Sequence, residues 1–354
     1  MQKKIFLIGF VLMMTNTILL LTSCEKDSDE PISKFNWKKI GLNGLEVRRL
    51  ELTGNDLYAM TNNGLFLKNI NTSSEFQLIG LQGKNILDIA VFSPNHILAS
   101  CRNPSDWLDY NIYETLDGGI NWNVKSTNFG IVESSETVND FEWDATDNIL
   151  YATGYGVVAK SYDFGANWEI IWGDWDFIGT GMIVSKNRYK DNDLWFGGQG
   201  GIENGFLINS FNNSIREWHD LVPNPTVIKA IAFDNQSQQN IYVGWEGELN
   251  KSNDHGSTWT TLIERHEEAH FFFGIGISQI NPNMLYAGKW IKAAPNQPLE
   301  IYYSSNGGMT WDLEIIPNES KGGILDLKVK SESNKDRIFV ALDGGGVYEL
   351  SPKN

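Results

Sequence analysis

The sequence predicts an all-β fold in which one four-stranded antiparallel unit is repeated seven times. Three observations predict it: a turn pattern recurs four times, strand-like segments recur seven times, and the composition is rich in glycine and aromatic residues, with 34 Gly and 13 Trp in 354 residues. The chain is 41% hydrophobic and 20% charged, which fits a globular protein and excludes a disordered, collagen-like or coiled-coil chain.

The first 23 residues are predicted to be a secretory signal peptide. Lys3 and Lys4 give a positive start, residues 5–21 are mostly apolar, and small residues follow. A transmembrane anchor is the alternative, but a 17-residue stretch interrupted by three polar residues at 15–17 is short for that purpose. We therefore expect residues 1–23 to be removed from the mature chain.

Residues 21–24, Leu-Thr-Ser-Cys, resemble the lipobox of bacterial lipoproteins, in which the cysteine is acylated and becomes the N-terminus. Residues 24–34 are then a lipidated Cys24 and an acidic tether, because 25–31 reads EKDSDEP and has little apolar surface to bury. The tract resembles the one that sends Bacteroidota lipoproteins to the outside of the outer membrane, although an ordinary solvated linker is the alternative. The resemblance implies an outer-membrane protein, lipid-anchored at Cys24 and exposed on the cell surface.

The chain is acidic, with 44 Asp and Glu against 28 Lys and Arg and a net charge of -16. A surface of this sign repels phosphate backbones, so we expect no nucleic-acid partner. Cys101 is the only other cysteine, and nothing beside it suggests a nucleophile, so we expect it to be buried in a strand.

Short strand-like segments recur along the rest of the chain. Most begin with a large aliphatic or aromatic pair and are followed by Gly or Asn, as expected for strands that end in turns. A second set of apolar segments precedes the first by a few residues and also has seven members. The first set lies at residues 56–60, 96–100, 149–153, 193–197, 240–244, 284–288 and 337–341.

An eight-residue pattern, Ser/Thr-x-Asp-x-Gly-x-x-Trp, recurs at residues 115–122, 161–168, 252–259 and 304–311, with Asn306 replacing the Asp in the last copy. Eroded copies end at Phe76 and Trp218. The pattern resembles the Asp-box, or BNR, repeat of seven-bladed β-propellers of the sialidase/xyloglucanase-like superfamily, over residues 36–354.

The chemistry of this pattern is structural. We expect each carboxylate to accept backbone N–H groups inside a tight turn, each Gly to supply a positive φ angle, and each Trp to pack between neighbouring sheets. The residues in these roles are Asp117, Asp163, Asp254, Asn306, Trp122, Trp168, Trp259 and Trp311.

The aromatic residues that close each unit are 39 to 52 residues apart, which fits four short strands and their turns, or one propeller blade. They are Trp37, Phe76, Trp122, Trp168, Trp218, Trp259 and Trp311. We therefore expect one domain at residues 35–354, a seven-bladed β-propeller of four-stranded antiparallel blades. The strand around Trp37 looks like one that follows an Asp-box, so it should join the C-terminal blade and close the ring.

Candidate functional residues come from the loops expected around the top of the central channel. Aromatic side chains beside charged ones suit sugar rings, which need an apolar platform with hydrogen-bonding groups at its edge. The alternative for Trp107, Trp245 and Trp290 is that they only fill gaps between blades. The candidates for catalysis are Arg102, Asp106, Tyr110, Glu246 and His270; those for ligand binding are Arg49, Trp107, Trp245, Lys289 and Trp290; Arg48, Tyr155, Gln199 and Glu203 belong to the same expected face.

Four enzyme classes offer analogies for these residues. Residues 266–270 match the H-E-x-x-H zinc pattern, but no helical pattern surrounds them and no third ligand is evident, so we predict no metal and no cofactor. Sialidases carry an Arg-Ile-Pro motif that this sequence lacks, and xyloglucanases use two facing propellers. Some polysaccharide lyases use one propeller with a His, a Tyr and an Arg, roles that His270, Tyr110 and Arg102 could fill.

The leading hypothesis is an outer-membrane surface lipoprotein that binds, and in a catalytic version also processes, a polysaccharide at the top face. Whether it is an enzyme, a glycoside hydrolase or a polysaccharide lyase, stays open. Expected partners are a glycan, the membrane through the lipid anchor, and proteins of a glycan-uptake system, with the chain itself a monomer. The alternative is a non-enzymatic protein-interaction or assembly platform, as in the photosystem II assembly factor and sortilin-like receptors of similar repeat type.

Overall fold

The computed structural model describes residues 33–72, 75–130, 137–173, 179–188, 193–200, 205–211, 214–218, 227–264, 269–316 and 318–353. The chain divides into two compact units, residues 1–32 and 33–354, and every described residue belongs to the second. The signal peptide, Cys24 and most of the acidic tether therefore lie outside the described residues, as do Glu203 and His266.

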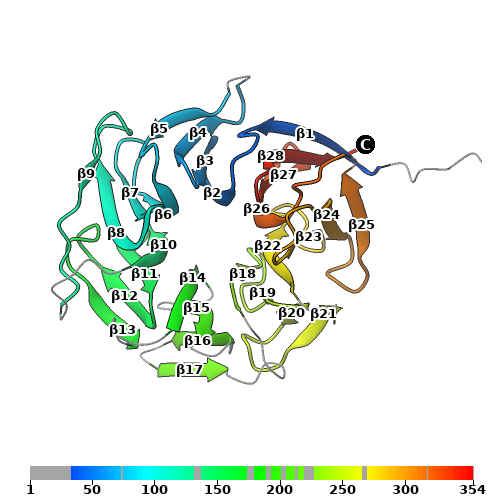
Figure 1. Cartoon of the computed structure of the whole chain (residues 1–354). Coiled ribbons are helices and arrows are strands. Elements are labelled where there is room, and N and C mark those ends of the chain that lie inside the picture. Colours follow the sequence, from blue (N-terminus) through cyan, green and yellow to red (C-terminus); the bar gives the residue numbers. More distant parts are fainter. Residues whose placement is uncertain are drawn as a thin grey trace, which may run out of the picture. The chain divides into compact units, whose positions relative to one another are not determined.

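The described residues form seven four-stranded antiparallel sheets arranged as blades around a central channel, with no helix (Figure 1). This confirms the predicted all-β, seven-bladed propeller. The strands of blades I to III are β2 (Val47–Thr53), β3 (Asp56–Thr61), β4 (Gly64–Asn69), β5 (Gln77–Gly80), β6 (Asn85–Val91), β7 (Ile97–Asn103), β8 (Asp106–Thr115), β9 (Asn123–Val124), β10 (Val138–Asp144), β11 (Ile149–Gly154), β12 (Val157–Ser161) and β13 (Glu169–Gly173).

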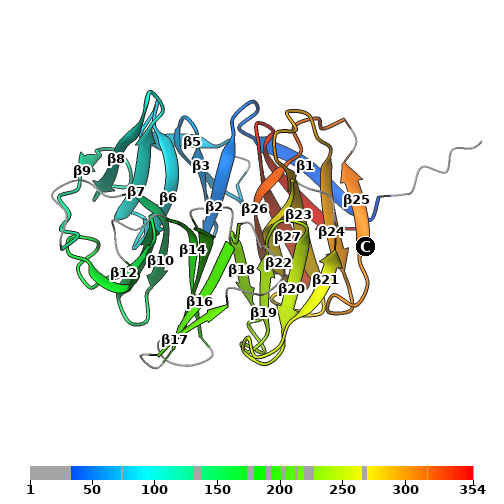
Figure 2. The ribbon, with the colours of Figure 1, turned by 60° about the horizontal axis from the view of Figure 1, so that its bottom comes forward.

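Blades IV to VI repeat the same order, from the innermost strand outward, and the tilted view shows the sheets standing side by side around the channel (Figure 2). Their strands are β14 (Gly179–Asn187), β15 (Asp193–Gly200), β16 (Gly205–Phe211), β17 (Ser214–Trp218), β18 (Ala230–Phe233), β19 (Ile241–Gly244), β20 (Glu248–Ser252), β21 (Thr260–Glu264), β22 (His270–Ile277), β23 (Leu285–Ile291), β24 (Leu299–Ser304) and β25 (Asp312–Ile316).

Blade VII is built from both ends of the described chain, as predicted. It contains β26 (Ile324–Glu332), β27 (Lys335–Leu342) and β28 (Gly346–Pro352), and β1 (Phe35–Gly41) adds the outermost strand. β1 runs antiparallel to β28, from the pair Phe35–Pro352 to the pair Gly41–Val347 (Figure 1). The ring therefore has no open blade.

Phe35, and not the repeat-marking Trp37, is the buried aromatic residue of this strand. Trp37 is 37% exposed, whereas Phe35 is 2% exposed and packs edge-on against Tyr286 and Tyr303. The two residues lie on the same face of β1, because side chains alternate along a strand. The end of β1 that carries Phe35 lies against blade VI, and Trp37 contacts Tyr348 of its own blade.

The four turns with the Ser/Thr-x-Asp-x-Gly-x-x-Trp pattern share one hydrogen-bond network. In the first, the Thr115 hydroxyl donates to Asp117 Oδ1 over 2.8 Å and accepts from Gly119 N, while Asn121 N donates to the same Asp117 oxygen over 2.8 Å. The same bonds recur around Asp163, Asp254 and Asn306. An amide oxygen thus does the work of the carboxylate at Asn306.

The tryptophans of these turns pack against neighbouring elements. Trp122 Nε1 donates to Ile79 O of blade I over 2.9 Å, and its ring occupies the space that a side chain at Gly80 would need. Trp168 is 7% exposed and stacks on Phe129. Trp259 lies in the same cluster as Trp195.

Three of the innermost strands are joined to the next blade through aspartates, buried at Asp88 and Asp140 and half-buried at Asp326, which we call staples. Asp88 Oδ2 accepts from Phe141 N of the next blade over 2.6 Å, and Asp140 Oδ2 accepts from Val184 N over 2.6 Å. Asp326 Oδ2 accepts from Leu50 N over 2.9 Å, which links blade VII to blade I. Each staple directly follows a β-bulge, which turns its side chain toward the next blade.

Candidate functional site

In each blade the innermost strand begins, and the second strand ends, on one side of the ring, which we call the top face. Residues at these ends come together at the channel mouth, although they are far apart in the sequence. We define the channel mouth by Arg48, Arg49, Arg102, Tyr155, Lys229, Trp290 and Asp343, which belong to six of the seven blades.

Four cations meet at the channel mouth of this acidic protein. Arg49 forms an ion pair with the buried Asp140 across two blades, and Arg48 Nε lies 2.7 Å from Glu46 Oε1. Burial lowers the pKa of Arg48, Glu46 raises it, and the nearby Arg102 lowers it further. The mouth is therefore a place where positive charges repel one another in a partly desolvated setting.

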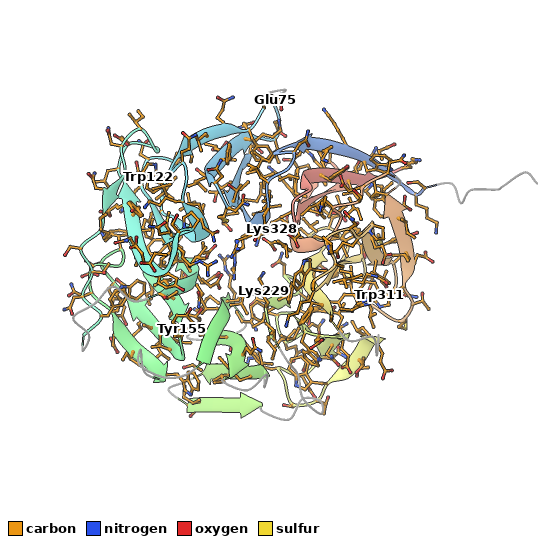
Figure 3. The ribbon with its side chains drawn as sticks, viewed as in Figure 1. Glu75, Trp122, Tyr155, Lys229, Trp311 and Lys328 are labelled. Carbon is orange, nitrogen blue, oxygen red and sulfur yellow. The ribbon has the colours of Figure 1, made fainter. Side chains whose placement is uncertain are left out.

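Lys229 is the cation with the least compensation. Its Nζ lies 4.7 Å from the ring centre of Phe273, and Figure 3 shows it at the centre of the ring together with Lys328. Burial, followed by the charges of Arg49 and Arg48, lowers the pKa of Lys229 to about 7. Lys229 is thus held between its charged and neutral forms near neutral pH.

Aromatic residues form one wall beside Lys229. Trp290 is half-buried and stacks on Phe273 with 5.5 Å between ring centres and 25° between planes. Its Nε1 donates to Asp343 Oδ2 over 2.9 Å, which fixes the indole across blades VI and VII. Trp290 therefore lies at the mouth with one edge bonded and its orientation set.

A pair of tyrosines forms the opposite side of the mouth. The hydroxyls of Tyr110 and Tyr155 are 3.0 Å apart, and Arg102 pairs with Tyr110 in the β7–β8 ladder. Burial and the bond to Tyr110 raise the pKa of Tyr155 to about 12. Tyr155 is therefore a neutral donor and acceptor over the physiological range.

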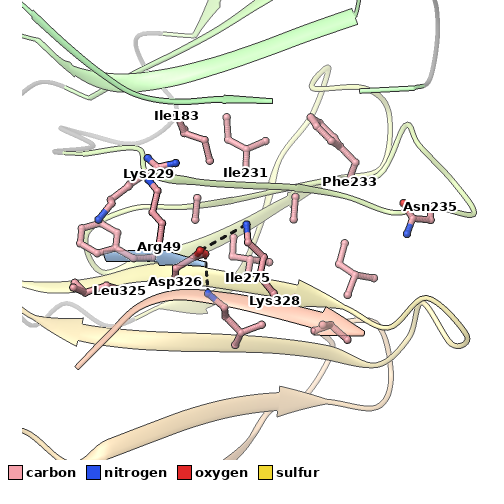
Figure 4. Close-up of a pocket in the computed structure, with 17 residues that line it drawn as sticks. Arg49, Ile183, Lys229, Ile231, Phe233, Asn235, Ile275, Leu325, Asp326 and Lys328 are labelled. Atoms are coloured by element: carbon pink, nitrogen blue, oxygen red, sulfur yellow. Dashed lines mark hydrogen bonds and ion pairs between the residues drawn. The ribbon is translucent and has the colours of Figure 1, made fainter. Parts of the chain in front are cut away.

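A cavity of about 220 Å³ extends from the mouth into the channel (Figure 4). Its apolar side comes from Ile183, Ile231, Phe233 and Ile275, and its polar side from Arg49, Lys229, Asp326 and Lys328. Lys328 Nζ lies 3.6 Å from Asp326 Oδ2, so that pair compensates itself.

Two of the predicted ligand-binding residues do not reach the mouth. Trp245 is 2% exposed and packs with Trp195 and Ile228 between blades, so it fills a gap and offers no face to a sugar. Lys289 points into its blade, where it forms an ion pair with Glu300. Both predictions are wrong. Side chains of the neighbouring blade cover Trp245, and Lys289 is held by the next strand of its own blade.

The remaining candidates lie elsewhere on the top face. Asp106 is exposed at the start of β8, and the side chain of Trp107 lies outside the described part of the structure. Glu246 Oε1 accepts from Ala269 N over 2.7 Å, which ties the blade V turn to the start of β22. His270 is half-buried and is the first residue of β22. Gln199 pairs with Thr180 in the ladder of blade IV. The predicted site residues that the structure brings together are thus Arg49, Arg102, Tyr110 and Trp290.

Sequence reasoning missed Lys229, Phe273 and Asp343. Lys229 and Phe273 occupy the position that corresponds to Arg48 in their own blades, one residue before the staple position. That correspondence was available from the aligned strand segments, because the two sets of repeats fix the register of each inner strand.

Among the described residues, no group of three or more His, Cys, Asp or Glu is placed to hold a metal ion.

The part of the chain that the structure describes contains no helix with the length and apolar character needed to span a bilayer.

Neither a protein-family model nor a curated protein matches the sequence. Solved structures do match in fold. The GH74 xyloglucanase from Xanthomonas campestris has 12% identity and a TM-score of 0.67, over 89% of this chain and 53% of that one. The extracellular domain of the one-component system BT4673 from B. thetaiotaomicron has 16% identity and a TM-score of 0.64, over 91% and 40%.

YCF48 from Cyanidioschyzon merolae has 14% identity and a TM-score of 0.61, over 88% of this chain and 98% of its own. This chain therefore spans about half the length of the xyloglucanase but almost all of YCF48. At such identities the similarity establishes the fold, and the chain is a seven-bladed β-propeller with the architecture of these proteins.

Proposed function

We propose that this chain is an outer-membrane surface lipoprotein whose propeller binds a polysaccharide at the channel mouth. The observation that carries the binding proposal is the position of Trp290 and Lys229, from two blades, which both lie against Phe273 beside the cavity. Arg102, from a third blade, lies close enough to Arg48 to act on its charge. An aromatic surface edged by charged donors is suited to sugar rings. The GH74 xyloglucanases among the similar structures make a polysaccharide an appropriate ligand class.

Binding is favoured over cleavage because the acids at the mouth are already engaged. Hydrolysis of a glycosidic bond usually needs two carboxyl groups on either side of that bond. Here Asp343 accepts from Trp290, Asp140 is paired with Arg49, and Glu46 lies beside Arg48. A lyase version would rely on Arg102 and Tyr110 at the mouth, with His270 on β22.

The binding proposal is tested with the full chain in detergent against a panel of polysaccharides. Trp290→Ala should weaken binding about tenfold or more, which corresponds to about 1.4 kcal/mol. Asp163→Ala, in an Asp-box turn, should lower the melting temperature and leave the affinity of the folded protein unchanged. If a ligand binds both variants as it binds the wild type, the site lies elsewhere. Assays for new reducing ends and unsaturated products distinguish processing from binding.

The lipoprotein proposal rests on the lipobox and the acidic tether. Cys24→Ala should abolish palmitate labelling and release the protein from membranes. Protease treatment of intact cells should remove the wild-type protein, and complete protection would place it on the inner side of the outer membrane.

A protein-interaction platform is the second candidate function. The observation that favours it is the match to nearly the whole of YCF48, which also has a structure bound to D1 peptide. Cross-linking from the channel mouth in intact cells would identify such a partner. A cross-linked protein that added polysaccharide fails to displace would support this function over glycan binding.

A further inference from the structure

The seven innermost strands contribute unequally to the channel. At the staple position, blades VII, I, II and III carry Asp326, Arg49, Asp88 and Asp140, whereas blades IV, V and VI carry Ile183, Ala230 and Gly274. One side of the channel is therefore crowded with charged, mutually bonded side chains. The other side has small or apolar residues, and the cavity opens there.

The cavity is small and has one polar end. At about 220 Å³ it lies below the roughly 300–1,000 Å³ of sites for drug-sized ligands, so it suits one sugar unit better than a length of chain. Ala230 and Ala232 of blade V line the cavity with small side chains. The polar end lies toward the mouth, where Lys229 and Arg49 are found.

Lys229 has no ion-pair partner in the part of the chain that the structure describes, while Lys328 has Asp326 and Arg49 has Asp140. The groups that act on Lys229 are Arg49 and Arg48, which repel its charge, and the more weakly acting Asp326 and Glu46, which attract it. An anion bound beside Lys229 and Arg49 would relieve this repulsion.

We propose that this cavity takes an acidic sugar: a uronate unit of the polysaccharide, with its carboxylate at Lys229 and Arg49 and its ring along the apolar lining of Ile231 and Ile275. The inference rests on the proposed function and names the class of glycan for the same site. A carboxylate matches the two donors, and the apolar lining supplies the contact that a sugar ring uses. In this acidic protein, an acidic glycan would otherwise meet mostly repulsive charge.

The experiment compares uronate oligosaccharides with the same oligosaccharides after carboxyl reduction, by calorimetry on the full chain in detergent. Oligomers of galacturonate, glucuronate and mannuronate cover the class. At pH 6 at least one acidic oligomer should bind about tenfold or more tighter than its reduced form. The preference should shrink between pH 6 and pH 8.5, because Lys229 loses its proton through that range.

Two substitutions test the assignment to Lys229. Lys229→Gln should remove the preference for the acidic oligomer, and Lys229→Arg should keep the preference and remove its pH dependence. Lys330→Gln is the matched control, because Lys330 lies on an inner strand as well but pairs with Glu332 away from the mouth. If Lys229→Gln fails to fold, reductive methylation of the wild-type chain replaces it: the uronate should slow modification of Lys229 and leave that of Lys330 unchanged.

The outcomes separate this inference from the function on which it rests. Binding of reduced and acidic oligomers with equal affinity, unaffected by Lys229→Gln, overturns the acidic-sugar inference and leaves glycan binding standing. Failure of every oligomer and of the polysaccharide panel overturns the proposed function, and the inference with it. A preference for acid that survives Lys229→Gln places the anion site elsewhere.

Discussion

Two acidic side chains of the innermost strands, Asp88 and Glu142, are desolvated inside the propeller. Burial raises the pKa of Asp88 to about 6, and burial together with Glu51 raises the pKa of Glu142 to about 8. A carboxyl group whose folded pKa is raised stabilises the fold at low pH, and this contribution is lost as the pH rises from the unfolded value through the folded one. The propeller should therefore lose stability between about pH 4.5 and pH 8.

Glu142→Gln should raise the melting temperature at pH 8 and change it little at pH 5. At pH 5 the wild-type carboxyl is already neutral, whereas at pH 8 half of it must ionise in a desolvated place next to Glu51. Thermal melts from pH 5 to pH 9 measure the difference. Glu75→Gln, an exposed residue at the rim (Figure 3), should show no such pH-specific gain. Equal shifts for Glu142→Gln at both pH values would contradict the assignment.

Sequence reasoning worked at this scale where spacing fixes geometry. The Asp-box residues lie in identical turns, because a short loop allows few conformations and each polar group has a fixed partner. Sequence reasoning failed for Trp245 and Lys289. The alternation of side chains along a strand predicts which face a residue lies on, but not which residues of the neighbouring strand or blade cover it. That depends on how all the blades pack in the ring.

The staples are the hydrogen bonds that join inner strands of neighbouring blades. Three inner strands use a buried or half-buried aspartate to accept a backbone N–H group from the next blade, at a point where the bulge interrupts the ladder. The paired ladders satisfy the backbone within each blade, so the staples act between blades. Together with apolar packing, they set the spacing of the inner strands around the channel.

Asp88→Ala should lower the free energy of unfolding by about 1–3 kcal/mol, because it leaves Phe141 N buried without its acceptor. Asp88→Asn keeps an acceptor oxygen and should recover most of that loss. Chemical denaturation at pH 7 measures both variants. Equal destabilisation by Asn and Ala would mean that the side chain's volume or charge, and not the bond to the next blade, is what matters.

The strands themselves were largely predictable and the staples were not. The repeated segments place β3, β7, β11, β15, β19, β23 and β27 as second strands of successive blades. The bulges depend on how neighbouring blades meet, which no local pattern of apolar residues encodes. Lys229 and Phe273 could have been found without knowing the bulges, because the aligned inner-strand segments place both at the position of Arg48.

At the scale of the whole molecule, β1 closes the ring by joining the two ends of the propeller. Its contribution is concentrated in Phe35, which fits between blades VI and VII, and much less in Trp37. Closure was predictable from the repeat count. The site was predictable only in part. The strand order identifies the loops at the top of the channel, but it does not give the distance of each side chain from the channel.

Phe35→Ala should lower the free energy of unfolding by about 3–5 kcal/mol, as expected for removal of a fully buried aromatic ring. Trp37→Ala removes a larger side chain from the same strand and serves as the matched control, with a much smaller expected loss because Trp37 is partly exposed. Chemical denaturation of both variants gives the comparison. A greater loss for Trp37→Ala would mean that blade VII closes in a different register.

The pairing of β1 with β28 also determines when the chain can finish folding. Roughly 300 residues separate the two strands, which at about 5–20 residues per second take about 15–60 s to synthesise. During that interval β1 has no partner, and its hydrogen-bonding edge is open to other nascent chains. Lys38 and Lys39, both exposed or half-buried in the finished blade, supply the charge that discourages such pairing. The two lysines therefore disfavour pairing of β1 with other chains until β28 has been synthesised.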